Sequence, residues 1–78
     1  MPGIIVYGKL SCEDTQRSLR LLKANKVSYI WVDVEKDTAG RQTAMRHNGG
    51  NLNTPTIVFD DGSVLVEPSD TALAAKLG

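Results

Sequence analysis

Cysteine is almost absent from this sequence, because Cys12 is the only one among 78 residues. A single cysteine cannot form a disulfide within the chain, so we expect no disulfide framework and a reducing, cytoplasmic location. The only histidine, His47, has no cysteine or second histidine near it in the sequence. We therefore expect no metal site built from these side chains.

Long apolar runs and an excess of charge of one sign are also missing. No run approaches about eighteen apolar residues and none resembles a signal peptide, so we expect neither a membrane span nor a targeting segment. The first predicted strand begins directly after residues 1–3, which leaves no room for such a segment. Nine basic and nine acidic residues give a net charge of zero without a basic stripe. We therefore expect no nucleic-acid partner.

The apolar content is sufficient for one small folded unit. The hydrophobic fraction of 41% is ordinary for a globular chain and too high for a disordered one. A chain of this length buries only ~60% of its unfolded surface, so its core must be compact. We expect a single domain over residues 1–78, without linker or repeat, present as a monomer.

Apolar periodicity and turn residues predict strands and helices in the order β-α-β-α-β-β-α. The predicted elements cover residues 4–7, 13–25, 27–34, 37–47, 56–59, 63–66 and a last helix that opens at 68–70. Asp60-Asp61-Gly62 is a strong hairpin signal. Gly40 should weaken the second helix by about 1 kcal/mol relative to alanine. Residues 27–34 alternate in a way that fits a strand covered on much of both faces.

Two helices show which of their faces should pack against the sheet. Leu19 and Leu22 lie three residues apart in the first helix, so they share one face. Leu73 and Leu77 lie four residues apart in the last helix and predict a second apolar face. We expect these four leucines to form part of the core.

The order of elements restricts the topology. A right-handed βαβ crossover makes the first two strands parallel, and the hairpin adds an antiparallel pair. The expected fold is therefore α/β, with a four-stranded mixed sheet and helices on both faces. Sites in open α/β sheets form at the carboxyl ends of parallel strands, and Cys12 follows the first strand. If the third strand runs antiparallel to the first, Thr54-Pro55 enters it from the same edge and brings Pro55 close to Cys12.

Cys12 lies where a helix begins, next to free backbone N–H groups and the positive end of the helix dipole. Thiols in this position can have a pKa well below the ordinary value of ~8.5, which makes Cys12 a candidate nucleophile. Glu13 and Asp14 oppose a thiolate beside them, while Lys9 opposes those two charges. The direction of the pKa shift is therefore open, and the alternative is an inert, buried thiol.

Several stretches together resemble the glutaredoxin family of the thioredoxin-fold superfamily, and most closely the short bacterial glutaredoxin-like proteins that include the mycoredoxins. The matching stretches are Val6-Tyr7-Gly8 before Cys12, residues 31–35 with Asp37, 48–51, 54–59, 61–63 and 68–69. They span nearly the whole chain. The resemblance implies a thioredoxin-like fold and thiol–disulfide chemistry at Cys12.

One departure from the family pattern changes the expected mechanism. Family members with two active-site thiols carry C-x-x-C, but this chain has Cys12-Glu13-Asp14-Thr15. Threonine stands where the resolving cysteine would be, so turnover must be monothiol, with a second small thiol resolving the adduct on Cys12. The stretch also differs from the Cys-Gly-Phe-Ser signature of glutaredoxins that carry iron–sulfur clusters.

The resemblance implies site residues around the first strand and helix. Lys9 resembles the family lysine that faces the thiol and a carboxylate of the bound tripeptide thiol, and the alternative is a solvated lysine. Thr15 either donates its hydroxyl to the Cys12 sulfur from one helical turn away or bonds to the backbone. Tyr7 either lines the site beside Cys12 or packs beneath it.

Further site residues are implied after the second helix. Pro55 resembles the family cis-proline. A cis bond after Thr54 would turn its backbone N–H and C=O toward the thiol, where they would pair with the substrate cysteine like an added strand. Ser69-Asp70 resembles the family pair that holds the γ-glutamyl end of glutathione. N-capping of the last helix is the alternative, and both roles are compatible because a helix N-terminus also binds carboxylate.

Three functions remain open. The first is a monothiol oxidoreductase that reduces protein mixed disulfides with glutathione or another low-molecular-weight thiol as co-substrate and no tightly bound cofactor. The second is a carrier of an iron–sulfur cluster bridged between two chains, with Cys12 and glutathione as ligands. The third is a non-catalytic module of the same fold that binds thiols or peptides. The Cys12-to-Thr15 stretch argues against the cluster carrier.

Overall fold

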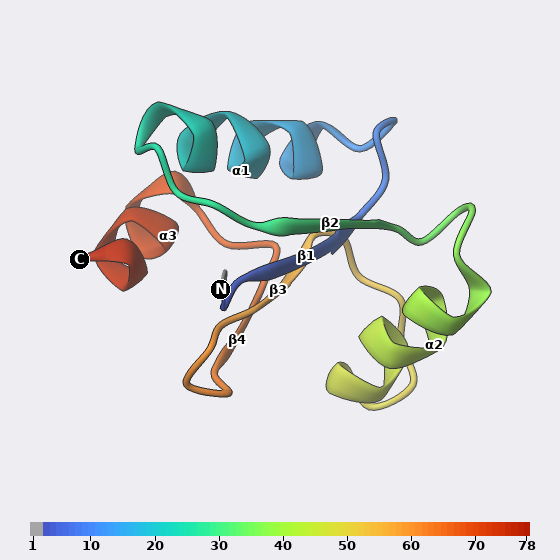
Figure 1. Ribbon diagram of the computed structural model, residues 1–78. Helices are drawn as coiled ribbons and strands as arrows, with labels where there is room; N and C mark the ends of the chain where they lie inside the picture. Colours follow the sequence, from blue (N-terminus) through green and yellow to red (C-terminus); the bar gives the residue numbers. More distant parts are fainter. Residues whose placement is uncertain (1–2) are drawn as a thin grey trace.

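The computed structural model describes residues 3–78 (Figure 1). The expectation that Met1 and Pro2 leave no room for a targeting segment concerns residues outside this range. The strands are β1 (Ile5–Gly8), β2 (Ile30–Asp33), β3 (Thr56–Val58) and β4 (Val64–Val66). They form a four-stranded sheet in the order β2-β1-β3-β4. β1 is parallel to β2 and antiparallel to β3, and β3 is antiparallel to β4, as the order of elements predicted.

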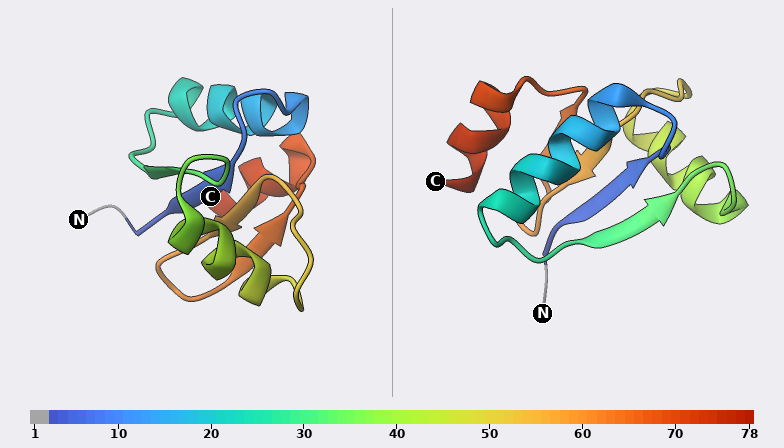
Figure 2. Two further views of the ribbon diagram at one scale, coloured as in Figure 1. Left: turned by 90° about the vertical axis from the view of Figure 1, so that its right-hand side faces the viewer. Right: turned by 90° about the horizontal axis from the view of Figure 1, so that it is seen from above.

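Three helices cover the two faces of this sheet. They are α1 (Glu13–Ala24), α2 (Thr38–His47) and α3 (Asp70–Leu77). α1 and α3 lie on one face and α2 lies on the other (Figure 2). The predicted α/β arrangement with helices on both faces is therefore confirmed.

The core beneath α1 and α3 is the larger of the two. Leu19 and Leu22 of α1 meet Leu73 of α3 there, above Val6 of β1 and Ile57 of β3. Leu22, Leu73, Val6 and Ile57 are completely buried. Full burial of one such side chain stabilises the fold by roughly 1.5–3 kcal/mol. The leucine faces expected from the sequence are therefore the ones that pack, with Leu77 partly buried at the edge of the same core.

The core beneath α2 is smaller and depends on a glycine. It contains Tyr7, Val34 and Ala44, with Val32 of β2 packed against it. A Cβ atom on Gly40 would overlap the Cγ1 atom of Val32. Glycine at this position lets the first turn of α2 approach the sheet. Glycine therefore has a packing reason at a position where the sequence indicated only a weaker helix.

β2 is shorter and more exposed than the sequence indicated. Residues 27–29 precede the strand, and the Val27 N–H donates to the Leu22 carbonyl oxygen at 3.0 Å to form a turn after α1. Ile30 shares a sheet face with Val32 but is 44% exposed, because α2 covers that face only toward the carboxyl end of the strand. The expectation of cover on much of both faces therefore applies only to the second half of β2.

The hairpin between β3 and β4 is held to the last helix. Asp61 in the turn accepts from the Ser63 N–H at 2.9 Å and from the Lys76 Nζ at 2.8 Å. The Lys76 ammonium, followed by the Ser63 donors, holds the pKa of the Asp61 carboxyl far below its usual range. These contacts fasten the end of α3 to the sheet.

Candidate functional site

Cys12 is the N-cap residue of α1 and follows the carboxyl end of β1. Its backbone is extended, with φ −90° and ψ 122°. The Cys12 N–H donates to the Lys9 carbonyl oxygen at 3.1 Å, and the Cys12 carbonyl oxygen accepts the first helical bond from Gln16 at 3.0 Å. The side chain makes no capping bond and is only partly buried. The thiol is thus placed at the helix N-terminus and remains open to a substrate.

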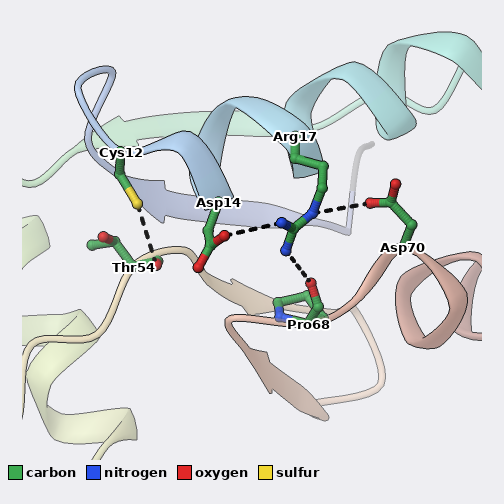
Figure 3. Close-up of polar contacts among 6 residues, drawn as sticks. All are labelled: Cys12, Asp14, Arg17, Thr54, Pro68 and Asp70. Carbon is green, nitrogen blue, oxygen red and sulfur yellow. Dashed lines mark hydrogen bonds and ion pairs between the residues drawn. The ribbon is translucent and has the colours of Figure 1, made fainter.

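The loop before β3 meets the thiol from the other side. The Cys12 thiol donates to the main-chain carbonyl oxygen of Thr54, with 3.6 Å between Sγ and O (Figure 3). The Thr54–Pro55 peptide bond is cis, and Pro55 is buried. Because β1 and β3 are antiparallel, the end of β1 and the start of β3 share one edge of the sheet. The loop that contains Thr54 and Pro55 therefore lies close to Cys12, as the sequence predicted.

The surroundings of Cys12 favour its thiolate. Partial burial raises the pKa of the thiol, but hydrogen bonds to the thiolate lower the pKa by more than burial raises it. They come from the Thr54 and Thr15 side chains and from the backbone N–H groups of Thr15 and Asp14. The Thr54 carbonyl by itself favours the protonated thiol, because it can only accept. Donors outweigh it, so the pKa of Cys12 lies below its ordinary value, a direction that the sequence left open.

Thr15 hydrogen-bonds to the backbone and also stabilises the Cys12 thiolate. It is completely buried, and its hydroxyl accepts from the Lys9 N–H at 3.5 Å while also helping to lower the pKa of Cys12. Its side chain packs directly against Gly8 at the end of β1. A Cβ atom on Gly8 would lie 2.6 Å from Thr15 Cγ2 and 2.8 Å from Thr15 Oγ1. Gly8 therefore provides the space in which the Thr15 side chain lies.

This contact predicts the effect of Gly8→Ala. The added methyl group must displace the stiff Thr15 side chain, so we expect a loss of roughly 1–3 kcal/mol in the free energy of unfolding. Because displaced Thr15 no longer stabilises the thiolate, the pKa of Cys12 should rise. Urea denaturation and the pH dependence of Cys12 alkylation measure the two effects. If Gly8→Ala lowers the free energy of unfolding in a Thr15→Ala background as much as it does in the natural chain, the added methyl group does not clash with Thr15.

Tyr7 and Lys9 flank the site without contacting the sulfur in the part of the chain described. Tyr7 is buried in the core beneath α2, and its ring centroid lies 6.4 Å from that of His47. Val6 faces α1, so Tyr7 faces the opposite side of the sheet. Lys9 is half-buried, and its ammonium forms no ion pair within residues 3–78. Lys9 is thus available to an anionic substrate group, whereas Tyr7 packs beneath the site.

Ser69 and Asp70 begin α3 next to the same edge. The Ser69 hydroxyl oxygen accepts from the Ala72 N–H at 3.1 Å, so Ser69 is the N-cap. The Asp70 carboxylate pairs with Arg17 of α1, at 3.3 Å between Oδ1 and Nε. Sequence reasoning did not find Arg17. Its spacing of three residues from Asp14 is a signal that could have shown the local ion pair, but no local pattern contains the pairing with Asp70.

The described chain contains no cluster of three or more His, Cys, Asp or Glu side chains placed to hold a metal ion. Among residues 3–78 no helix is long and apolar enough to cross a bilayer. The group at this edge of the sheet with the clearest chemistry is the partly exposed Cys12 thiol, whose pKa lies below its ordinary value.

Comparison with known proteins identifies a matching family and sequence relatives of this chain. The family model described as Glutaredoxin matches residues 4–64. A provisionally named glutaredoxin of Mycobacterium tuberculosis, found in two strains, is 36% identical over 75 residues, which cover 96% of this chain and 89% of the relative.

Solved structures agree on the arrangement of the elements. A thioredoxin-like protein, crystallised as a mutant, is 31% identical with a TM-score of 0.81, over 96% of this chain and 99% of that one. The glutaredoxin of Methanosarcina mazei has a TM-score of 0.81 at 21% identity, over 99% of this chain and 79% of that one. These similarities confirm the thioredoxin-like fold expected from the sequence.

Proposed function

Because the chain belongs to the glutaredoxin family, we propose that it is a monothiol thiol–disulfide oxidoreductase. Its substrates are mixed disulfides between proteins and a low-molecular-weight thiol, which is glutathione or an analogue such as mycothiol or bacillithiol. The observation that carries the proposal is the Cys12 thiol, partly exposed at the N-terminus of α1 with a pKa below its ordinary value. The same domain acts as a cytoplasmic monomer without a tightly bound cofactor.

The proposed reaction has two exchange steps. The Cys12 thiolate attacks the small-thiol sulfur of the mixed disulfide. A new disulfide forms between Cys12 and the small thiol, and the protein thiolate leaves and takes up a proton. A second small thiol, as its thiolate, then attacks the small-thiol sulfur of the Cys12 adduct. This step releases the Cys12 thiolate and the disulfide of the small thiol. In total the protein sulfur is reduced, one free small thiol is consumed, and it ends in a disulfide with the small-thiol unit of the substrate.

The other site residues have supporting roles in this proposal. The Thr54 backbone groups pair with the backbone of the substrate cysteine, as in an added strand. Lys9 binds a carboxylate of the small thiol through its unpaired ammonium. Ser69 and Asp70 bind the other end of that molecule at the N-terminus of α3, where the helix dipole favours anionic groups.

The pH dependence of Cys12 alkylation by iodoacetamide, followed by mass spectrometry, tests the proposal. We expect a midpoint below the ordinary thiol pKa of ~8.5, because hydrogen bonds and the helix N-terminus stabilise the thiolate. A lowered pKa increases the thiolate fraction at neutral pH, so alkylation should already be rapid there. Cys12→Ser is the control and should show no labelling.

Turnover completes the test. Reduction of a glutathione mixed disulfide, coupled to glutathione consumption, should proceed with the unmodified chain and cease with Cys12→Ser. A midpoint at or above ~8.5, together with no turnover with any small thiol, would contradict the enzyme and leave a non-catalytic binding module. Visible absorption of the anaerobically purified chain would instead indicate an iron–sulfur cluster carrier.

A further inference from the structure

Arg17 joins the two helix N-termini beside the thiol. Its guanidinium contacts Asp14 Oδ1 through Nη1 at 3.0 Å, Asp70 Oδ1 through Nε at 3.3 Å, and the Pro68 carbonyl oxygen through Nη2 at 3.3 Å (Figure 3). The guanidinium therefore pairs with two carboxylates and donates one hydrogen bond, from Nη2 to the Pro68 carbonyl oxygen, whereas the buried Nε has no hydrogen-bond acceptor in the described chain. A lysine ammonium at the end of a flexible chain cannot match this fork geometry.

The two carboxylates that pair with Arg17 lie in the first turns of α1 and α3. Asp14 is in the first turn of α1, and its backbone N–H helps to lower the pKa of Cys12. Asp70 is the first residue of α3. Each carboxylate complements a helix N-terminus. The Asp14 carboxylate, two residues after Cys12, also adds negative charge near a sulfur that must itself become negative.

The charge balance of the three side chains depends on Arg17. With Arg17 present, the charges of Arg17, Asp14 and Asp70 sum to about −1, and without it they sum to about −2. Its removal would also leave two like charges unpaired between the packed ends of α1 and α3. Both effects would disfavour a thiolate at Cys12.

We propose that Arg17 is a positioning residue for Cys12, which acts by holding and neutralising the carboxylates of Asp14 and Asp70. The helix N-terminus, instead of the acidic side chains, then dominates the electrostatic field at the sulfur. This inference deepens the proposed function, on which it rests, because it explains how the thiol is kept reactive although Asp14 follows it in the first turn of α1.

The remaining charged groups near the site limit the size of the effect. Lys9 precedes Cys12 and favours the thiolate, whereas Glu13 follows it and opposes the thiolate. The side chains of Arg17 and Asp14 are 38% and 41% exposed, so water and salt screen their interaction. The expected change in the pKa of Cys12 is therefore moderate and should shrink at high ionic strength.

Arg17→Met and Arg20→Met form a matched pair for the test. Both remove one positive charge from α1, but Arg20 is exposed and forms no ion pair among residues 3–78. We expect Arg17→Met to raise the apparent pKa of Cys12, measured by iodoacetamide alkylation against pH, by roughly 0.5. Arg20→Met should raise it by less than half as much. Equal shifts would overturn the proposal, because only net charge would then matter.

A second comparison separates the action through Asp14 from a general loss of structure. In an Asp14→Asn background, Arg17→Met should raise the pKa of Cys12 less than it does in the natural sequence. The reason is that the Asp14 charge, which Arg17→Met would leave unpaired, is already absent. Arg17→Lys keeps the charge but not the planar fork, so its pKa for Cys12 should lie between those of the natural chain and Arg17→Met. This variant keeps the test valid if Arg17→Met unfolds. If Arg17→Met lowers only the melting temperature and leaves the pH profile unchanged, Arg17 is merely structural and the proposal fails.

Alkylation needs no small thiol and no turnover. The Arg17 comparison therefore gives a result even if the chain proves not to be an oxidoreductase, and failure of one proposal can be distinguished from failure of the other.

Discussion

Thr15→Cys is expected to change the product that forms when the chain reacts with oxidised glutathione. The natural chain should stop at a mixed disulfide and gain the mass of one glutathionyl group at Cys12. The Thr15→Cys chain should instead lose two hydrogen atoms, because the second thiol attacks Cys12 Sγ, expels glutathione and closes an internal disulfide. Mass spectrometry of the intact chain distinguishes these products directly.

The geometry around position 15 supports formation of an internal disulfide in the Thr15→Cys chain. The Thr15 side chain is one of the groups that lower the pKa of Cys12, and it lies in a buried space next to Gly8. Side chains three residues apart on a helix have Cβ atoms about 5–6 Å apart, and a disulfide needs about 3.5–4.5 Å. A small closing movement is sufficient. The intramolecular step then competes far better than a second glutathione molecule from solution.

Ser18→Cys is the matched control for this variant. It also gives the chain two cysteines, and Ser18 is a buried residue of α1 whose hydroxyl has no hydrogen-bond partner in the described chain. Position 18 lies two turns along the helix from Cys12, beyond the reach of a disulfide. We expect Ser18→Cys to keep the mixed disulfide. An equally persistent adduct in Thr15→Cys would show that the side chain at position 15 does not reach the sulfur.

Leu73→Ala should cause the largest loss of stability among the changes considered. Leu73 is completely buried between α1 and the sheet, against Leu22 and Ile57. Removing its branched end loses burial and leaves a cavity, which together cost about 2–5 kcal/mol. In a domain of this size each kcal/mol shifts the melting temperature by roughly 4–8 °C. Urea denaturation should therefore give a much lower midpoint with an unchanged slope.

Leu77→Ala makes the same chemical change on the same helix and serves as the comparison. Leu77 is only partly buried, so its truncation should cost clearly less than that of Leu73. Similar losses from both variants would mean that α3 is stabilised mainly by its own helix formation and not by the core. Because α3 carries Ser69 and Asp70, loosening it should also weaken binding of the small thiol.

Local patterns were sufficient to predict the order of the elements and the place of the thiol. Spacing of leucines, alternation in strands and the Asp-Asp-Gly turn are properties of short segments. They place Cys12 where β1 ends and α1 begins, and they place the Thr54 loop at the same edge. The replacement of a resolving cysteine by Thr15, and with it the monothiol prediction, is also visible in the sequence.

Contacts between distant residues could not be predicted in this way. Gly40 was expected only to weaken α2, but its close approach to Val32 explains why glycine is present there. β2 was expected to be longer, and only the position of α2 limits the part of it that is covered. Such effects depend on how packed elements meet, which no short segment contains.

The sequence by itself therefore determined the fold class and the place of the single thiol, and it led to the prediction that an external thiol completes the cycle. Only the tertiary structure decided the direction of the Cys12 pKa and the contacts of Arg17. Within the sequence, a helix N-terminus and two acidic neighbours act on Cys12 in opposite directions, so their sum has no evident sign. Folding adds Thr54 from the loop before β3 and pairs Arg17 with Asp70 of α3. Both contacts join residues far apart in the chain, and the Thr54 side chain is among the groups that lower the pKa of Cys12.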